Sequence, residues 1–209
     1  MTRLLTRAVQ CQVGLESVRR VPRSAHCQGV GARSTSAPNR ERERAPASTY
    51  LITFVCYGAR LPGTVGAVDR LHNVPGSRKP TPDTARESEA RERMTDAPYL
   101  LDAVRRKAVL AAVCEVCSHR EWTLLASHVR TNHVHVVVEA CQKPERVMNA
   151  FKCYASRALE QLRVDSPGRR RWARHGSTRY LWTKETVSAA VHYVICEQGE
   201  PLSVYEAQW

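Results

Sequence analysis

The chain has 209 residues, which suits one domain of ordinary size with a terminal extension. It carries 32 Lys and Arg against 20 Asp and Glu, so its net charge is +12 and its pI is about 9.7. This excess of positive charge favours polyanionic partners such as nucleic acid. No apolar run reaches the roughly 18 residues that a membrane span requires, so the sequence indicates a soluble protein with no membrane partner.

Residues 1–48 are predicted to be a disordered, Arg-rich N-terminal extension. Residues 1–49 hold nine Arg, no Lys, three acidic residues and no Phe, Trp or Tyr. Such a segment cannot bury enough apolar surface to offset the entropy lost on ordering. The same composition is typical of an organelle transit peptide, and a start codon assigned too far upstream would also produce it. We expect one folded domain over residues 49–209.

The folded part is predicted to mix strands and helices. Residues 50–57 are β-branched and aromatic and predict a strand that Gly58 ends. Residues 61–96 are rich in Pro, Gly and charge and predict a long loop. The pattern then predicts, in chain order, a helix over 100–116, strands over 122–129 and 133–140, a helix over 143–162, a basic loop over 166–179, a short strand over 180–182 and a helix over 185–198. This order fits an α+β fold in which one antiparallel sheet carries helices on one face.

The eight cysteines are scattered along the chain. Cys114 and Cys117 form its single C-x-x-C motif, and no second pair follows at zinc-finger spacing. We therefore expect free thiols in a reducing compartment.

The strand over 133–140 contains two histidines two residues apart. Alternate side chains of a strand point to the same face, so His133 and His135 project together while Val134 and Val136 point to the other side. Two imidazoles on one face of a rigid strand are pre-spaced to hold one divalent metal with coordination positions left open.

The last predicted helix supplies further chemistry. Tyr193 and Glu197 are four residues apart and share one helix face. If that face packs over His133 and His135, the carboxylate completes a metal site and the phenol lies beside it as a nucleophile. Gln198, one position further round the helix, is a competing third ligand.

Taken together, these residues resemble the single-tyrosine HUH transposases of the REP-associated and insertion-sequence type. The family pattern of Asn, His, hydrophobe, His and hydrophobes is matched by Asn132 to Val138. Further matching segments are Thr53-Phe54 with Tyr57-Gly58, Val68-Asp69-Arg70 with His72-Asn73, Lys152 to Arg157, Arg171 to Thr178, and Tyr193-Val194 with Glu197 to Pro201. The resemblance spans about residues 49–206, and it departs from the family at Arg60, where members often carry Trp.

The resemblance implies a ferredoxin/RRM-like HUH fold and a transposase that cleaves and rejoins single-stranded DNA at hairpin-flanked element ends. Tyr193 would attack the scissile phosphate and leave a 5′-phosphotyrosine and a free 3′-OH. Mg²⁺ or Mn²⁺ would be held by His133, His135 and Glu197. The resemblance also implies a homodimer, and we expect it in a bacterial cytoplasm, associated with the nucleoid.

Basic residues interleaved with aromatic rings predict the DNA contacts, because Arg binds phosphates and rings stack on bases. The predicted DNA-binding residues are Lys152, Arg157, Arg169, Arg170, Arg171, Trp172 and Arg174. Tyr180 and Trp182 continue the same pattern. The Arg-rich extension is a rival source of affinity, although it has no ring to stack on.

Two alternatives remain open from the sequence. Tyr154 lies on a basic helix and is a rival nucleophile, but Ala158 occupies the position four residues later where a metal ligand would be needed. The chain could also be a catalytically silent DNA-hairpin-binding protein, or a host-domesticated or replication-type nickase of the same fold.

Overall fold

A computed structural model describes residues 46–66 and 80–208. In chain order its elements are β1 (Ser48–Cys56), α1 (Thr84–Glu92), α2 (Ala103–Arg120), β2 (Thr123–Val129), β3 (His133–Ala140), α3 (Pro144–Gln161), β4 (Trp172–Leu181), α4 (Lys184–Cys196) and β5 (Ser203–Glu206). The extension predicted over 1–48 lies outside the described residues up to position 45, as do the motif residues at 68–73.

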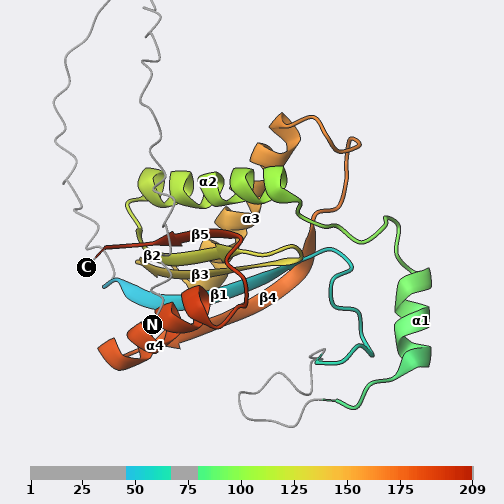
Figure 1. Cartoon of the computed structure of the whole chain (residues 1–209), viewed down its shortest axis with the longest axis horizontal. Coiled ribbons are helices and arrows are strands. Elements are labelled where there is room, and N and C mark those ends of the chain that lie inside the picture. Colours follow the sequence, from blue (N-terminus) through green and yellow to red (C-terminus); the bar gives the residue numbers. More distant parts are fainter. Residues whose placement is uncertain (1–45, 67–79, 209) are drawn as a thin grey trace, which may run out of the picture.

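One sheet organises the molecule. Its strand order is β4-β1-β3-β2-β5, and each neighbouring pair is antiparallel (Figure 1). The predicted α+β fold with an antiparallel sheet is confirmed. Within the described ranges, none of the helices is long and apolar enough to cross a membrane.

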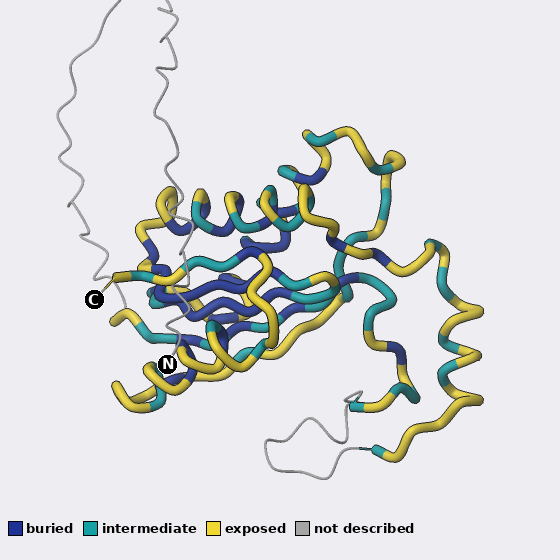
Figure 2. The backbone as a smooth tube through the Cα atoms, viewed as in Figure 1, coloured by how far each residue is buried: buried dark blue, intermediate teal, exposed yellow. Residues whose placement is uncertain are grey.

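The larger core lies between the sheet and the helices α2 and α3. Alternate residues of the two central strands point into it, among them Phe54 of β1 and Val136 of β3, both with 0% exposure. Val113 of α2 and Phe151 of α3 meet them from the other side. Figure 2 shows the resulting band of buried backbone through the middle of the sheet.

The opposite face of the sheet is covered by α4. Its buried residues Ala190, Val191 and Val194 pack on Ala126 and Val137, which point away from the larger core. Figure 1 shows α4 on the side of the sheet remote from α2. The prediction that helices lie on one face only is therefore wrong: a two-sided apolar pattern in β3 requires cover on both faces.

Helix α1 falls inside the segment that the sequence predicts as a loop. It has no buried residue, and it begins at Asp83, whose carboxylate accepts a hydrogen bond from Arg86 N–H at 3.0 Å. The ion pair between Glu87 and Arg91, at 2.7 Å, links successive turns. An apolar periodicity cannot reveal a helix that rests on capping and charge pairing alone.

Strand β4 is longer than expected, and β5 was not expected at all. The sequence predicts a basic loop over 166–179 and a strand over 180–182, but β4 runs continuously beside β1 from Trp172 to Leu181. It is an edge strand with mostly exposed side chains, so it lacks the alternation that marks a half-buried strand. β5 is only four residues long and pairs with β2 at the other edge.

Gly176 allows β4 to lie close to β1 and α3. A Cβ atom at this position would lie 2.5 Å from the Thr53 carbonyl oxygen and 2.5 Å from Met148 Sδ. We predict that Gly176→Ala lowers the free energy of unfolding by about 1–3 kcal/mol, because the backbone must shift to admit the methyl group. Thermal denaturation measures this, and Ser177→Ala, at an exposed neighbour, is the control. Equal stability of the two variants would contradict the close approach.

Candidate active site

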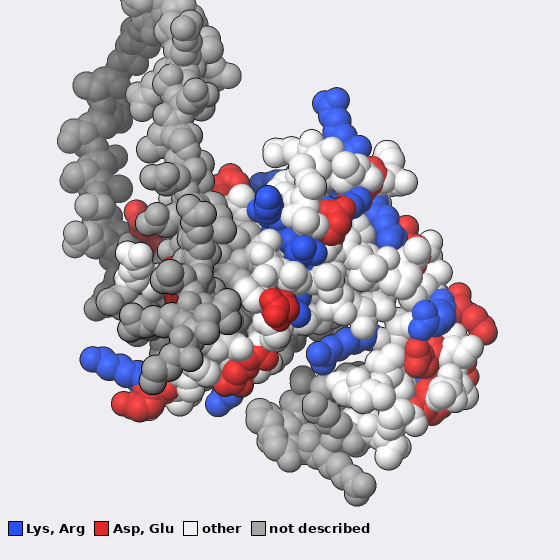
Figure 3. Space-filling model, viewed as in Figure 1, with Lys and Arg blue, Asp and Glu red and all other residues white. Residues whose placement is uncertain are grey.

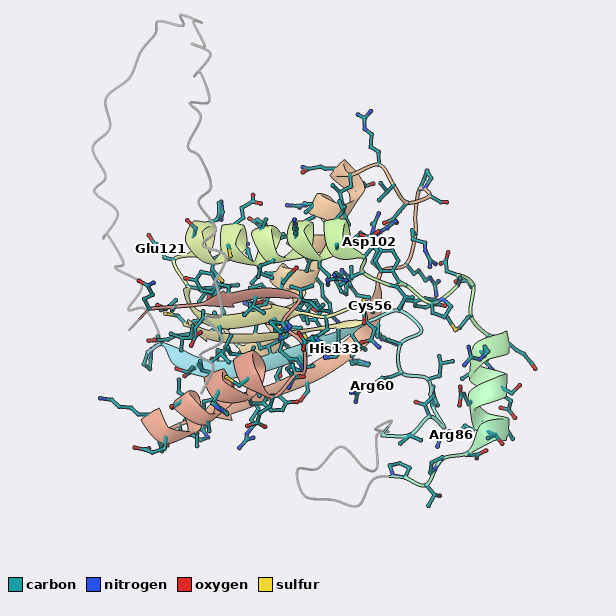
Figure 4. All side chains as sticks on the ribbon, in the orientation of Figure 1. Cys56, Arg60, Arg86, Asp102, Glu121 and His133 are labelled. Carbon is teal, nitrogen blue, oxygen red and sulfur yellow. The ribbon has the colours of Figure 1, made fainter. Side chains whose placement is uncertain are left out.

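The two strand histidines converge on the face covered by α4. His133 and His135 have ring centroids 4.8 Å apart, with planes at 80°. Their strand, β3, lies between β1 and β2, and Thr53 of β1 is directly opposite His135 in the register. Figure 4 shows His133 between the sheet and α4. The alternation of side chains along β3 produces this pairing, as the sequence predicts.

Each imidazole uses its Nδ1 atom for a hydrogen bond within the protein. His133 Nδ1 donates to Asn132 Oδ1 at 2.6 Å, and His135 Nδ1 is hydrogen-bonded to Thr53 Oγ1 at 2.7 Å. These bonds orient both rings, and the donor role of His133 Nδ1 leaves Nε2 of that ring with a free lone pair. A ring held through one nitrogen is the usual arrangement of a histidine whose other nitrogen binds a metal.

The site environment keeps both imidazoles neutral. Burial lowers the pKa of His133 to about 4, and the positive charge of Arg60 adds to this effect. Burial also lowers the pKa of His135 to about 3, with His133 as the next cause. Neutral imidazoles are the form that binds metal ions.

Tyr193 lies against this pair. Its ring centroid is 5.5 Å from that of His135, and the planes meet at 76°. The side chain is 38% exposed, so solvent or a bound strand can reach the phenol. The rival tyrosine, Tyr154, is on α3, packs against the larger core and has Arg157 over its ring at 5.7 Å. Since α3 covers the other face of the sheet, Tyr154 is remote from the histidines.

Gln198, not Glu197, is the residue that the structure brings to the histidines. The Gln198 side chain lies near enough to both rings to counteract part of the effect of burial on their pKa values. Its Nε2 donates to the Tyr193 carbonyl oxygen at 3.2 Å.

Glu197 points away from this site. Its carboxylate is 3.1 Å from His192 Nδ1 on the exposed side of α4, and its side chain is 56% exposed. Helix α4 ends at Cys196, so the i,i+4 projection from Tyr193 no longer applies where Glu197 caps the helix. The expected convergence of Glu197 with His133 and His135 is not found.

The residues present fit a divalent ion of the Mg²⁺ or Mn²⁺ type. The described ranges contain no group of three His, Cys, Asp or Glu residues that could hold a metal. Two imidazole nitrogens and one amide oxygen nevertheless make a mixed N/O donor set with positions left for a phosphate.

Comparison with known protein families gives one match. The family model described as "Transposase IS200 like" matches residues 97–195, just under half of the chain, and includes His133, His135 and Tyr193. Over residues 97–195 the chain is similar to the IS200-like transposases. The recognition made from the sequence is thereby confirmed.

A solved structure described as the REP-associated tyrosine transposase bound to a REP hairpin is also similar. It shares 10% sequence identity with a TM-score of 0.43, and the match covers 72% of this chain. The chain spans 66% of the length of that structure. None of the curated proteins compared with this chain matches it.

Two of the predicted DNA-binding residues are engaged in contacts within the fold. Lys152 is 9% exposed, and its Nζ donates to the carbonyl oxygens of Ala173 and His175 at 2.8 and 3.1 Å. Trp172 packs edge-on against Phe54, with ring centroids 5.0 Å apart, and its Nε1 donates to a hydroxyl on α3. Both side chains tie β4 to its neighbours.

Two of the predicted arginines are held in ion pairs. Arg169 lies 3.1 Å from an oxygen of Asp96, and Arg171 Nε donates to Asp165 Oδ2 at 3.0 Å. Asp165 is itself bound by Tyr99 Oη at 2.7 Å. These contacts fix the segment before β4, so the two arginines have a structural role.

The remaining predicted residues, Arg157, Arg170 and Arg174, are exposed, as is Arg179 of β4. At the end of β4, the rings of Tyr180 and Trp182 stack with centroids 4.9 Å apart and planes at 8°. Trp182 is 76% exposed. Figure 3 shows Lys and Arg interspersed with Asp and Glu on the visible face, so charge alone does not mark one DNA surface.

Sequence reasoning missed three residues of the site. Thr53 and Asn132 orient the histidines, and both belong to segments that the family pattern includes. His128 lies directly opposite His135 in the register of β2 and β3 and is fully buried. The sequence contained one signal for His128. It lies on a predicted strand that a tight turn joins to the strand of the histidine pair, and such strands pair side by side.

The lowered histidine pKa values predict how stability depends on pH. The unfolded chain binds protons at His133 and His135 below about pH 6.5, whereas the folded chain binds them there only near pH 4 or lower. Their contribution is therefore present above about pH 6.5 and is lost as the pH falls toward 4. We predict that denaturant midpoints fall over this window, and fall less steeply in His133→Gln and His135→Gln. His175→Gln, at an exposed histidine, is the control. Equal slopes in all variants would contradict the prediction.

Proposed function

We propose that this chain is a transposase that cleaves and rejoins single-stranded DNA through a covalent intermediate on Tyr193. The observation that carries the proposal is the contact of the Tyr193 ring with His135, on a sheet face where two neutral imidazoles and Gln198 converge. The similarity of residues 97–195 to the IS200-like transposases supports the same class of reaction.

The covalent step is a transesterification. The phenol oxygen of Tyr193 forms a bond to the scissile phosphorus, and the bond from phosphorus to the 3′ oxygen breaks. The phenol proton passes to the solvent that reaches this side chain, and the leaving 3′ oxygen takes up a proton from solvent. The products are a 5′-phosphotyrosine and a free 3′-OH. Rejoining reverses the step: a 3′-OH attacks the phosphotyrosine and releases the phenol. No external energy source is needed, because one phosphodiester is exchanged for another ester.

The surrounding residues prepare this step. His133 and His135 are each held by a hydrogen bond at Nδ1, which leaves Nε2 of each ring for a bound Mg²⁺ or Mn²⁺. Gln198 is the proposed third ligand. When bound, such an ion polarises a phosphoryl oxygen and orients the phosphate. Gln198 also hydrogen-bonds the backbone of Tyr193, so the ligand and the nucleophile are fixed relative to each other.

The proposed partner is single-stranded or hairpin DNA, as the family resemblance implies. Within one chain the histidines, Gln198 and Tyr193 already lie together, which supports a cleavage step carried out by a single copy. A homodimer would then serve to bring two DNA ends together. A catalytically silent hairpin-binding protein is the alternative, and it would bind the same DNA without forming an adduct.

The first test concerns the nucleophile. We predict that Tyr193→Phe abolishes the covalent adduct with a single-stranded oligonucleotide in Mn²⁺, because the ring remains but the attacking oxygen is removed. DNA affinity should stay within about twofold, since the ring contact with His135 is kept. Denaturing gel electrophoresis detects the adduct. Tyr154→Phe is the control, and loss of the adduct in that variant instead would transfer the role to Tyr154. No adduct with the wild type would favour the silent protein.

A second test distinguishes the two candidate ligands. Gln198→Ala should weaken Mn²⁺ binding by about 10-fold or more, because it removes one of three donors. Glu197→Ala should leave it unchanged, since that carboxylate pairs with His192. Calorimetric titration of Mn²⁺ into each variant gives the affinities. The opposite ranking would restore Glu197 as the ligand.

The third test locates the DNA surface. We predict that replacing Arg170, Arg174 and Arg179 with Ala weakens hairpin binding and reduces the salt slope by about 2, the value for three lost contacts to a single strand. Replacing Arg86 and Arg91 of α1 and Arg93 at its C-terminal end changes the net charge equally, and this replacement should have little effect on hairpin binding. Deleting residues 1–48 should also have little effect at moderate salt. Gel shifts on one oligonucleotide measure all three. Strong loss only in the deletion would make the extension the binding element.

A further inference from the structure

The third histidine of the site has no place in the chemistry proposed above. His128 lies on β2, opposite His135 and on the same face of the sheet, and its side chain is 0% exposed. Burial lowers its pKa. A fully buried imidazole is retained only where its nitrogens have partners, because an unpaired polar group in an apolar core is costly.

Both nitrogens of His128 are engaged. Nδ1 lies 3.0 Å from the carbonyl oxygen of Val194, and Leu202 N–H donates to Nε2 at 3.3 Å. A carbonyl can only accept and a backbone N–H can only donate, so the ring is the neutral tautomer with its proton on Nδ1. One tautomer satisfies both bonds at once.

These two bonds hold the chain on either side of Gln198, the proposed metal ligand. Val194 follows Tyr193 in the last turn of α4, where backbone carbonyls need partners from outside the regular helix. Leu202 lies beyond the helix, just before β5. Gln198 is between them. A ring that binds both ends of this segment limits where the Gln198 side chain can lie.

Arg130 reinforces the same segment. Its Nη1 donates to the carbonyl oxygen of Glu200 and lies 3.4 Å from His128 Nε2. Arg130 is in the turn between β2 and β3, so it is attached to the strand that bears the histidine pair. The segment 194–202 is thus anchored to the sheet at three backbone positions, namely Val194, Glu200 and Leu202.

We propose that His128 is a positioning residue: it caps the end of the tyrosine helix and holds Gln198 and Tyr193 in register with His133 and His135. The inference rests on the proposed function only for its effect on cleavage. The anchoring of residues 194–202 is a property of the fold and is measurable without metal or DNA.

The test compares three variants of the full chain. His128→Leu keeps a similar volume and removes both hydrogen bonds. His128→Asn retains a donor close to the position of Nδ1. Ser127→Ala is the matched control, because the neighbouring hydroxyl is buried and has no hydrogen-bond partner within the described residues. Amide hydrogen exchange of residues 194–202, measured without metal, reports the anchoring directly.

We expect faster exchange across 197–202 in His128→Leu than in the wild type or Ser127→Ala. Adduct formation should slow by about 10- to 100-fold, the range found when a group that orients a metal ligand is removed. DNA affinity should be unchanged, and His128→Asn should recover part of the rate. Nitrogen chemical shifts of the wild-type ring should report the Nδ1–H tautomer.

Two results would overturn the proposal: exchange across 197–202 in His128→Leu equal to that in Ser127→Ala, or a ring protonated on Nε2. If His128→Leu does not fold, the exchange of His128→Asn decides, with faster exchange than in Ser127→Ala expected. If the wild type forms no adduct, the proposed function fails, while the exchange comparison still decides the role of His128.

Discussion

The site depends on the alternation of side chains along β3, a central strand with both faces covered. Val134 and Val136 point into the core beneath α2 and α3, and His133 and His135 point toward α4. The apolar half of the strand fixes the register, because a shift by one residue would turn the histidines into the larger core and the valines toward α4. The packing that stabilises the fold is therefore what aims the two imidazoles.

Helix α4 completes the arrangement by crossing the second face. Its own apolar residues, Ala190, Val191 and Val194, hold it against the sheet and leave Tyr193 beside His135 at the border of the contact. Burial beneath the helix also keeps the histidines neutral. One packing contact thus positions the proposed nucleophile, sets the electrostatic environment and, just past the helix end, places the amide of Gln198.

The sequence predicted much of this from local pattern. The bounds of β3 and the shared face of its histidines follow from a period of two, and the spans of α2, α3 and α4 follow from apolar spacing and the caps, to within a few residues. The exposed elements were missed for a physical reason. Neither α1 nor β4 buries a patterned face, so capping, ion pairs and backbone pairing form them without an apolar signal.

The third ligand shows where local reasoning ends. Glu197 was favoured as the third ligand because i,i+4 geometry holds within a helix, but the helix ends one residue earlier, and we propose Gln198 in its place. Lys152 and Trp172 were assigned to DNA because charge and rings are visible in a sequence, whereas their partners in β4 and α3 are tertiary. Residue type indicates what a side chain can do, and packing decides whether it is available.

The most direct test of the central claim is the position of a bound ion. Crystals of the chain soaked in Mn²⁺ should give an anomalous difference peak between the Nε2 atoms of His133 and His135, with the Gln198 amide oxygen as a further ligand and the Tyr193 phenol adjacent. A peak at His192 and Glu197 instead, or at neither place under saturating Mn²⁺, would contradict the account of one metal and phenol site on the α4 face of the sheet.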